Sequence, residues 1–556
     1  MDKTMNNKMR TDVAVESLTG GDAVVESLKR WDVDTVFGLP GVQLDQLFDA
    51  LHRRGNGIRV IHTRHEQGAA YMALGAAAST GKPAVFAVVP GPGVLNAGAA
   101  LSTAYACGAR VLCVTSTVAT AQIGRGNGAL HEIPDQTGYL RGLTKWYGRA
   151  TSAAEVPAVM DEAFRQLMSG RPRPVAVEVP PDVLAQRAVF APQVRPAVPA
   201  RPLVDASAVE SAASLLMAAK KPMILVGSGA RHAGPDLTRL AERLQAPVVS
   251  RTQGRGIVPD TSDYSWSAAM ANDQWADVDV VLALGTRMTQ LREWGTDKDL
   301  SVIRVDIDYP EIVRSGPPRL GIVADAADFT AELLALVEAR GFQAVDRREE
   351  LRRVRTDFAA TLTQTIQPQT DYLRAIRAVL PDDGILVDEM TQVGFVARYA
   401  FPVTHPHGFI SSSYQGTLGY GFATAIGVQA ANPDRRVVAI SGDGGFLFTM
   451  PELSVLAQQQ IPLTTVVFAD GHFGNVRRIQ ERSYGERFIA SELHNPDFVQ
   501  LAQSFGIRGL RAEGPAGLQD ALATAFAGDG PTLIEVPVRI EDMASPWQFV
   551  HGRKVR

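Results

Sequence analysis

The sequence alternates short runs of β-branched and other apolar residues with alanine-rich segments of helical length. Runs such as "PAVFAVV" (83–89), "VDVVLALG" (278–285) and "RRVVAI" (435–440) recur along the 556 residues. Strands that are apolar along their whole length are buried on both faces, which is typical of parallel sheets covered by helices. The pattern therefore predicts an α/β protein built from doubly wound parallel sheets.

Three blocks of this kind follow one another, and a chain of 556 residues is too long for a single core. The first block ends near residue 190, where the Pro-rich stretch "APQVRPAVPARPLVD" (191–205) predicts a linker. The second ends in the charged segment "DRREELRRVRTDF" (346–358), which predicts a solvent-exposed helix. We therefore expect an N-terminal domain over 1–190, a central domain over 191–358 and a C-terminal domain over 359–556.

Composition and charge narrow the functional classes. The net charge is −4 and the charges are scattered, so the chain has no basic track for nucleic acid. The only cysteines, Cys107 and Cys113, lie in apolar context, which fits a reducing compartment better than a disulfide framework. The polar N-terminus lacks the apolar core of a signal peptide, and the apolar region 84–114 is interrupted by "PGPG". We therefore expect a cytoplasmic protein without a membrane span.

A single acidic residue stands among glycines in "ISGDGGFLFTMPEL" (440–453), directly after an apolar run. Asp443 there is open to two ordinary interpretations, a helix cap or an Asx turn. After a further predicted helix and strand, "ADGHFG" places Asp470 at the end of the adjacent element. Two carboxylates at neighbouring strand ends predict an Mg²⁺ site that bridges to a phosphate group. The glycines that would expose backbone N–H groups to the phosphates are Gly442, Gly444, Gly445 and Gly474.

The "GDGG" motif, with an acidic residue 27 positions after its Asp, resembles the cofactor motif of thiamine diphosphate enzymes. Other segments resemble the acetolactate synthase group of that family in the expected order: "TRHEQGAAYMALGAAASTGKPAV" (63–85), "PGPGVLNAGAALSTAY" (90–105), "TKWYGRA" (144–150) and "SYQGTLGYGFATAIGVQAANPD" (413–434). The resemblance covers nearly the whole chain. It implies a pyrimidine-binding first domain, a central domain and a diphosphate-binding third domain.

The resemblance also implies the metal ligands, which are Asp443, Asp470 and the backbone carbonyl of His472. This chain departs from the family where Ala469 and Asp470 stand in place of the usual Asn-Asn pair. An aspartate still offers a metal ligand, so the departure changes the charge of the site more than it removes the site.

Four further residues are implied to contact the cofactor. Glu66, in "RHEQGAA", resembles the glutamate that engages a pyrimidine nitrogen and activates the cofactor, although a glutamate in a first helical turn is often only solvated. Leu418 resembles the bulky residue beneath the cofactor, and it also suits a core position. The carbonyl of Gly416 would hold the pyrimidine amino group, and Gln392 would lie beside the diphosphate.

Enzymes of this group decarboxylate a 2-oxo acid and then release an aldehyde or pass the acyl unit to a second carbonyl. The chain has no adjacent-histidine pair like that of pyruvate decarboxylases, which favours acyl transfer, and simple decarboxylation stays open as an alternative. Val42 stands where synthases carry a small residue and benzoylformate decarboxylases a serine. In "LHE" (130–132), His131 replaces a glutamine of the synthases, and it is either a proton relay or an ordinary surface or core residue.

The synthases hold a non-reactive flavin dinucleotide in the central domain. Here "DYSWSAAMANDQWADVD" (263–279) and "GTRMTQ" (285–290) differ from the matching segments, so we expect flavin binding to be weak or absent. Two other classes stay open. "GSGARHAG" (227–234) is a weak signal for a dinucleotide-dependent oxidoreductase. A catalytically silent regulatory homologue is disfavoured because Glu66 and Asp443 are both present.

In this family each cofactor lies between the first block of one chain and the third block of another. Since Glu66 is in the first block and Asp443 in the third, the resemblance implies a homodimer or a pair of dimers. A monomer that brings its own two blocks together is the alternative.

Overall fold

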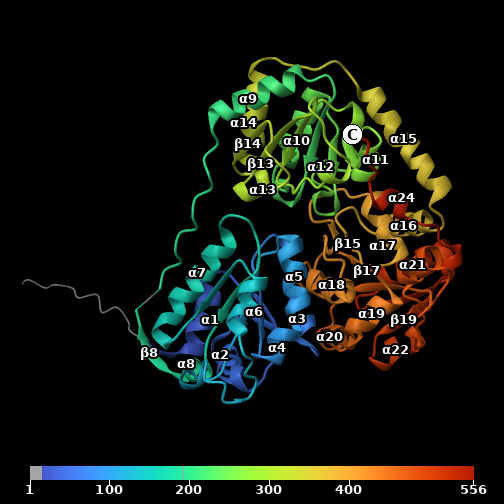
Figure 1. Ribbon diagram of the computed structural model, residues 1–556. Coiled ribbons are helices and arrows are strands. Elements are labelled where there is room, and N and C mark those ends of the chain that lie inside the picture. Colours follow the sequence, from blue (N-terminus) through green and yellow to red (C-terminus); the bar gives the residue numbers. More distant parts are fainter. Residues whose placement is uncertain (1–15, 192) are drawn as a thin grey trace, which may run out of the picture.

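The computed structural model describes residues 16–191 and 193–556, which form three six-stranded parallel sheets flanked by helices (Figure 1). This arrangement confirms the predicted α/β class with three doubly wound domains. None of the helices in the described residues combines the length and the apolar character that crossing a membrane requires.

The first sheet has the strand order β3-β2-β4-β5-β7-β6. Its strands are β2 (Thr35–Gly38), β3 (Arg59–His62), β4 (Ala84–Val88), β5 (Val111–Thr115), β6 (Trp146–Arg149) and β7 (Val175–Glu178). The helices are α1 (Gly20–Arg30), α2 (Asp45–Arg54), α3 (Glu66–Thr80), α4 (Pro92–Asn96), α5 (Gly98–Cys107), α6 (Gln136–Leu143), α7 (Val156–Met168) and α8 (Pro181–Ala185). A small antiparallel pair, β1 (Glu16–Thr19) with β8 (Arg187–Phe190), also joins the two ends of this domain, and the sequence pattern did not predict it.

The central sheet has the order β11-β10-β9-β12-β13-β14, which reverses between β9 and β12. Its strands are β9 (Pro222–Val226), β10 (Val248–Ser250), β11 (Ser265–Ser267), β12 (Val280–Leu284), β13 (Ser301–Asp306) and β14 (Leu320–Val323). The helices are α9 (Ala206–Ala218), α10 (Gly234–Leu244), α11 (Ala268–Asn272), α12 (Gln290–Glu293), α13 (Tyr309–Val313) and α14 (Ala326–Ala339). Counted in chain order the strands read 3-2-1-4-5-6, the order of dinucleotide-binding folds.

The third sheet has the order β16-β15-β17-β18-β20-β19, which is the order of the first sheet when strands are counted within each domain. Its strands are β15 (Ile385–Val387), β16 (Phe409–Ile410), β17 (Val437–Gly442), β18 (Thr464–Ala469), β19 (Arg508–Arg511) and β20 (Thr532–Pro537). The helices are α16 (Gln369–Val379), α17 (Gln392–Ala400), α18 (Tyr420–Ala431), α19 (Asp443–Thr449), α20 (Leu453–Gln459), α21 (Gly474–Tyr484), α22 (Phe498–Ser504), α23 (Gly514–Phe526) and α24 (Trp547–Val550).

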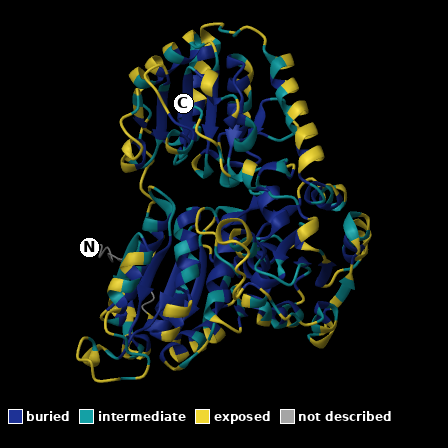
Figure 2. Ribbon diagram, turned by 45° about the vertical axis from the view of Figure 1, so that its right-hand side comes forward, coloured by how far each residue is buried: buried dark blue, intermediate teal, exposed yellow. Residues whose placement is uncertain are grey.

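Two segments join the three domains, and one of them is irregular while the other is helical. Residue 191 and residues 193–205 form no helix or strand. The charged segment lies in helix α15 (Arg348–Thr365), in which only Leu351 and Leu362 are buried, and the expected boundary at 358 falls inside this helix. Figure 2 shows the exposed side of α15 beside the buried sheets.

Helices α3 and α18 cross so closely that they join the first and third domains of one chain (Figure 1). A Cβ atom added at Gly75 would lie 2.1 Å from the carbonyl oxygen of Thr424, and one added at Gly427 would lie 1.9 Å from that of Met72. Both helices are apolar all round because each is covered on every side. The two glycines therefore allow the close approach that builds a core shared by two domains.

Candidate active site

The two acidic residues of the predicted metal site lie at one edge of the third sheet. Asp443 is the first residue of α19 and follows Gly442 at the end of β17. Strand β18 runs parallel to β17 with Phe468 opposite Gly442, so Asp470 leaves the sheet beside Asp443. The carboxyl ends of neighbouring parallel strands are where α/β proteins bind ligands.

The carboxylate of Asp443 is fixed by three hydrogen bonds. Its Oδ1 atom accepts from the backbone N–H of Gly444 at 2.8 Å. Its Oδ2 atom accepts from the N–H of Gly471 at 2.7 Å and from Nδ2 of Asn495 at 2.6 Å. Asn495 was not identified from the sequence, because it lies in an irregular segment without a motif. The Gly471 bond ties Asp443 directly to the turn that follows Asp470.

Burial raises the pKa of both carboxyl groups above their ordinary values. The pKa of Asp470 rises to about 6, first through burial and then through the negative charge of Asp443. For Asp443 burial is again the largest cause, and hydrogen bonds to the carboxylate oppose it. Two carboxylates that repel each other where water is scarce are stabilised by a cation between them.

Two carboxylates alone do not complete the coordination sphere of a divalent cation. Among residues 16–191 and 193–556, no three Asp, Glu, His or Cys side chains gather as a metal site. Mg²⁺ takes about six oxygen ligands and commonly draws several of them from phosphates and water. Asp443, Asp470 and the predicted carbonyl of His472 therefore suit a cation that also binds a phosphate group. The backbone N–H of His472 donates to Oδ1 of Asp470 at 2.9 Å and fixes that side chain.

Gln392, the first residue of α17, has its side chain close to the carboxylate of Asp470. It is only 5% exposed, and its Oε1 atom is buried without a hydrogen-bond partner. A Cβ atom added at Gly474 would lie 2.8 Å from Oδ2 of Asp470 and 3.6 Å from Nε2 of Gln392. Buried polar atoms are normally paired, so the free amide oxygen indicates a polar ligand or water at this position.

Glu389 is a buried acid that was not identified from the sequence. Its Oε1 atom accepts a hydrogen bond from the N–H of Gly419 at 2.6 Å, and a Cβ atom added at Gly445 would lie 2.5 Å from the same oxygen. Burial raises the pKa of Glu389 to about 7. The residue thus joins the loop that carries Leu418 to the helix that begins at Asp443. Its signal was available, because "DE" directly follows the buried strand run "ILV" (385–387).

The loop around Leu418 bridges two domains. Gly416 is exposed and has a φ of 57°, a left-handed conformation that favours glycine. Oγ1 of Thr417 lies 3.0 Å from Oγ1 of Thr103 in the first domain, and Leu418 is half-buried. The loop is therefore held in place, while Gly416 and Leu418 stay accessible to a ligand.

Glu66 is the first residue of α3 and is half-buried. Its Oε2 atom accepts a hydrogen bond from Nδ2 of Asn96 at 2.9 Å. A Cβ atom added at Gly93 would lie 3.5 Å from Oε1 of Glu66, so the "PGPG" turn forms one wall around the carboxyl group. Asn96 is a contact that sequence reasoning did not find.

His131 and Val42, which lie far apart in the sequence, belong to one surface. Nδ1 of His131 lies 2.9 Å from Oε1 of Gln43, whose Nε2 atom donates to the carbonyl of Leu130 at 2.8 Å. Val42 is 66% exposed beside Gln43. Gly91 packs against the backbone of His131, and Gly93 of the same turn packs against Glu66.

Among the described residues of one chain, no hydrogen bond joins the Glu66 group to the metal loop. Among the described residues, Glu66 forms its side-chain hydrogen bond with Asn96, and no partner of Asp443 comes from the first domain. The first-domain segment next to Glu66 instead contacts Glu452, beyond the far end of α19.

A large cavity lies elsewhere, between the three domains. It measures about 920 Å³, and neither Glu66 nor the two metal-site carboxylates line it. Gly227 and Gly285, which follow β9 and β12, lie on its wall at the point where the strand order reverses. Open α/β sheets bind ligands at such points.

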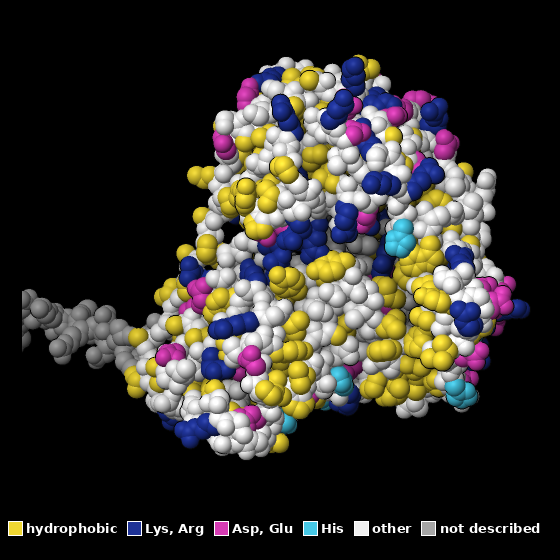
Figure 3. All heavy atoms as spheres, viewed as in Figure 1, with side chains coloured by type: hydrophobic (Ala, Val, Ile, Leu, Met, Phe, Trp, Pro, Cys, Tyr) yellow, Lys and Arg dark blue, Asp and Glu magenta, His cyan; other side chains and the backbone are white. Residues whose placement is uncertain are grey.

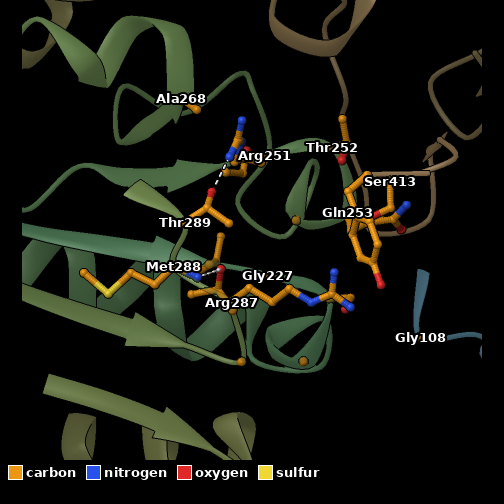
Figure 4. A pocket seen from close by; sticks show the side chains of 18 of the residues that line it. Gly108, Gly227, Arg251, Thr252, Gln253, Ala268, Arg287, Met288, Thr289 and Ser413 are labelled. Atoms are coloured by element: carbon orange, nitrogen blue, oxygen red, sulfur yellow. Dashed lines mark hydrogen bonds between the residues drawn. The ribbon is translucent and has the colours of Figure 1, made fainter. Parts of the chain in front are cut away.

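The walls of this cavity are positively charged. Figure 3 shows basic side chains gathered in the hollow beneath the central domain, and Figure 4 shows Arg251 and Arg287 from close by. Arg287 lies over the ring of Tyr414 at 4.2 Å, and burial lowers the pKa of Arg231 to about 10. In the part of the chain that the structure describes, Arg110, Arg231 and Arg287 form no salt bridge. The cavity therefore suits an anionic ligand.

Three parallel-sheet domains, with two carboxylates and several glycines at the strand ends of the third, define a class of α/β protein with a candidate site for a metal and a phosphate group. Family models for thiamine pyrophosphate enzymes match all three domains: the N-terminal TPP-binding domain over 18–139, the central domain over 209–333 and the C-terminal TPP-binding domain over 389–536.

Similar proteins extend over almost the whole chain. A probable 2-ketoarginine decarboxylase of Pseudomonas aeruginosa is 34% identical over 94% of this chain and 94% of its own length. The acetolactate synthase isozyme 1 large subunit of Escherichia coli is 30% identical over 95% of each chain. The mitochondrial acetolactate synthase catalytic subunit of Saccharomyces cerevisiae is 31% identical over 95% of this chain and 82% of its own length. The chain belongs to the thiamine pyrophosphate enzyme family.

Proposed function

We propose that this chain is a thiamine diphosphate- and Mg²⁺-dependent enzyme that decarboxylates a 2-oxo acid and transfers the acyl unit to a second carbonyl compound. One observation carries the proposal above others. Asp443, Asp470 and the unpaired amide of Gln392 converge at the strand ends of the C-terminal TPP-binding domain.

The residues present fit the cofactor. Asp443, Asp470 and the carbonyl of His472 would hold the metal, and Gln392 would hold the diphosphate together with the glycines at 442, 444, 445 and 474. Bound thiamine diphosphate supplies a carbon nucleophile that adds to the 2-oxo acid and accepts the electron pair released with CO₂. The chain supplies binding, orientation and proton transfer.

Proton transfer falls to Glu66 in the first domain. Its carboxyl group is half-buried and oriented by Asn96, so it would present one fixed oxygen to the cofactor's pyrimidine ring. Leu418 and the carbonyl of Gly416 would orient the cofactor from the third domain. Glu389 accepts a hydrogen bond from Gly419 and packs against Gly445, so it holds that loop beside α19.

His131 is the proposed proton relay on the substrate side. Gln43 fixes the imidazole through Nδ1, which leaves Nε2 for the substrate. The turn over 91–93 packs against the backbone of His131 and the side chain of Glu66, so it links the two residues. The absence of an adjacent-histidine pair supports acyl transfer over simple aldehyde release.

Two alternatives have a specific observation behind them. The similarity to a probable 2-ketoarginine decarboxylase favours decarboxylation without transfer. The 3-2-1-4-5-6 order of the central sheet and its basic cavity favour a dinucleotide-dependent oxidoreductase. Thiochrome fluorescence of the denatured, freshly purified protein separates the thiamine-dependent possibilities from the oxidoreductase.

The experiment that tests the function is incubation of the protein with a panel of 2-oxo acids, thiamine diphosphate and Mg²⁺. CO₂ release and products are followed by mass spectrometry, with and without added aldehydes or a second 2-oxo acid as acceptor. We expect CO₂ together with a product that joins donor and acceptor. CO₂ with free aldehyde alone would establish the simple decarboxylase, and no CO₂ from any donor would refute both.

The assembly we propose is a homodimer, or a pair of dimers, in which each site draws on two chains. The lack of a hydrogen bond between the Glu66 group and the metal loop in the described residues of one chain supports it. A two-fold arrangement would place the first domain of one chain on the third domain of the other and form two equivalent sites.

Weak or absent flavin binding remains our proposal for the central domain. The sequence departures at 263–279 and 285–290 support it, whereas the cavity of about 920 Å³ is large and basic enough for the phosphates of a dinucleotide. The visible absorption spectrum of the purified protein decides between these possibilities.

A further inference from the structure

The metal site of this chain differs in charge from the usual one of its family, and the difference lies in Asp470. Where the family pattern has an uncharged amide, the structure places a second carboxylate beside Asp443 at the same sheet edge. Oδ1 of Asp470 is occupied by the N–H of His472, and Oδ2 faces the space that Gly474 leaves open. One oxygen of the extra carboxylate is therefore available to a ligand.

A second observation shows that this space is built for a ligand. Only 5% of Gln392 is exposed. Its Nε2 atom and Oδ2 of Asp470 both approach the same point beside Gly474. Its Oε1 atom has no partner among the described residues. An acidic pair alone would not define a site, but this pair lies beside a buried amide whose Nε2 atom approaches the same point and whose Oε1 atom has no partner.

The charge of the two carboxylates determines whether this space binds the cation or the diphosphate first. A divalent cation between Asp443 and Asp470 is neutralised by the protein, because two negative charges balance two positive ones. With one carboxylate and one amide the same cation would keep a net positive charge and would depend on the diphosphate for neutralisation. Affinity for hard cations rises with the number of charged ligands. The mutual repulsion of the two carboxylates in this buried place adds to the gain when a cation arrives.

We propose that Asp470 allows the metal to bind before the cofactor. The chain binds one divalent cation in the absence of the diphosphate, and thiamine diphosphate then binds to the metal-loaded site. This inference rests on the proposed function, because it concerns the same site. It also implies a cost for the second step. The metal-loaded site is neutral, so it attracts the diphosphate less strongly than a site with an amide would.

The test measures metal and cofactor binding, not activity. The full-length protein is stripped with a chelator and titrated with Mn²⁺ alone, and free Mn²⁺ is counted by electron paramagnetic resonance. We expect one Mn²⁺ per chain without cofactor. Asp470→Asn should weaken this binding about tenfold or more, and at saturating Mn²⁺ it should bind thiamine diphosphate more tightly than the wild type. Asp520→Asn, the same charge change at an exposed position of helix α23, should change neither.

The outcomes separate this inference from the proposed function. If the wild type binds no Mn²⁺ until thiamine diphosphate is added, or if Asp470→Asn binds Mn²⁺ as tightly as the wild type, the metal-first order is wrong while the proposed function stands. If the wild type does not bind thiamine diphosphate even at saturating Mn²⁺, the proposed function fails. Circular dichroism checks the fold of each variant, and Asp470→Glu, which keeps the charge, should retain Mn²⁺ binding.

Discussion

Oε1 of Glu452 accepts a hydrogen bond of 3.0 Å from the backbone N–H of His65, a residue 387 positions earlier in the chain. The same carboxylate also accepts from the N–H of Arg64, so the third domain holds the segment directly before Glu66. Glu452 is almost completely buried, and burial raises its pKa to about 7.

The first prediction concerns pH and this contact. Because the folded-state pKa of Glu452 lies above its ordinary value of 4.5, its contribution to stability is complete below about pH 4.5 and is lost as the pH rises through about 7. Ionisation of Glu452 should cost up to about 3 kcal/mol across this window. Glu452→Gln should flatten the fall in the denaturation midpoint between pH 5 and pH 8, whereas Glu332→Gln on the exposed face of α14 should leave the slope unchanged. An equal slope in wild type and Glu452→Gln would contradict the assignment.

The second prediction concerns the crossing of α3 and α18. A Cβ atom at Gly427 would lie 1.9 Å from the carbonyl oxygen of Met72, so Gly427→Ala should force the helices apart and cost about 3 kcal/mol or more. Gly142→Ala is the matched control, because Gly142 is exposed on α6 with nothing within 4 Å of an added Cβ atom. The control should be neutral or slightly stabilising. Equal melting temperatures for both variants would show that this crossing tolerates separation.

The third prediction concerns the metal. Asp443→Ala should abolish retention of thiamine diphosphate in the presence of Mg²⁺, because the diphosphate loses its metal bridge and the hydrogen bonds from Gly471 and Asn495 lose their acceptor. Calorimetric titration with cofactor and Mg²⁺ measures this, with Asp520→Ala as the control. Unchanged cofactor affinity in Asp443→Ala would remove Asp443 from the metal site.

The fourth prediction concerns activation of the cofactor. Glu66→Gln should keep cofactor binding but slow deuterium exchange at the thiazolium carbon of the bound cofactor severely, because an amide keeps the shape without exchanging the proton. Asn96→Ala should slow exchange less, since Asn96 only orients the carboxyl group. Wild-type exchange in Glu66→Gln would exclude Glu66 as the activating group.

The fifth prediction concerns assembly. Chains with Glu66→Gln and chains with Asp443→Ala are each expected to be inactive, yet a co-refolded mixture should regain about a quarter of the sites' activity, because half of the dimers are mixed and each holds one intact site. A purified mixed dimer should regain about half. No recovery in the mixture, or an active species of 59.7 kDa by light scattering, would defeat the two-chain site.

Much of the fold could be predicted from the sequence because a buried strand is encoded by a continuous run of apolar residues. Apolar runs such as 83–89 and 435–440 predicted parallel strands; the first run contains β4 and the second overlaps β17. Asp443 was recognisable because its glycines and the preceding strand are adjacent in the chain. Glu389 gave the same kind of signal after β15, although it was not used.

What the sequence by itself determined is the set of elements and the identity of the acidic strand-end residues, since both depend on neighbours a few positions away. Tertiary structure alone decided which distant groups meet: Asn495 with Asp443, Asn96 with Glu66, and Glu452 with His65. These pairs are set by how strands order in a sheet and how closely two helices pack. Side-chain contacts between elements far apart in the chain leave no periodic pattern in either partner, so only the folded chain reveals them.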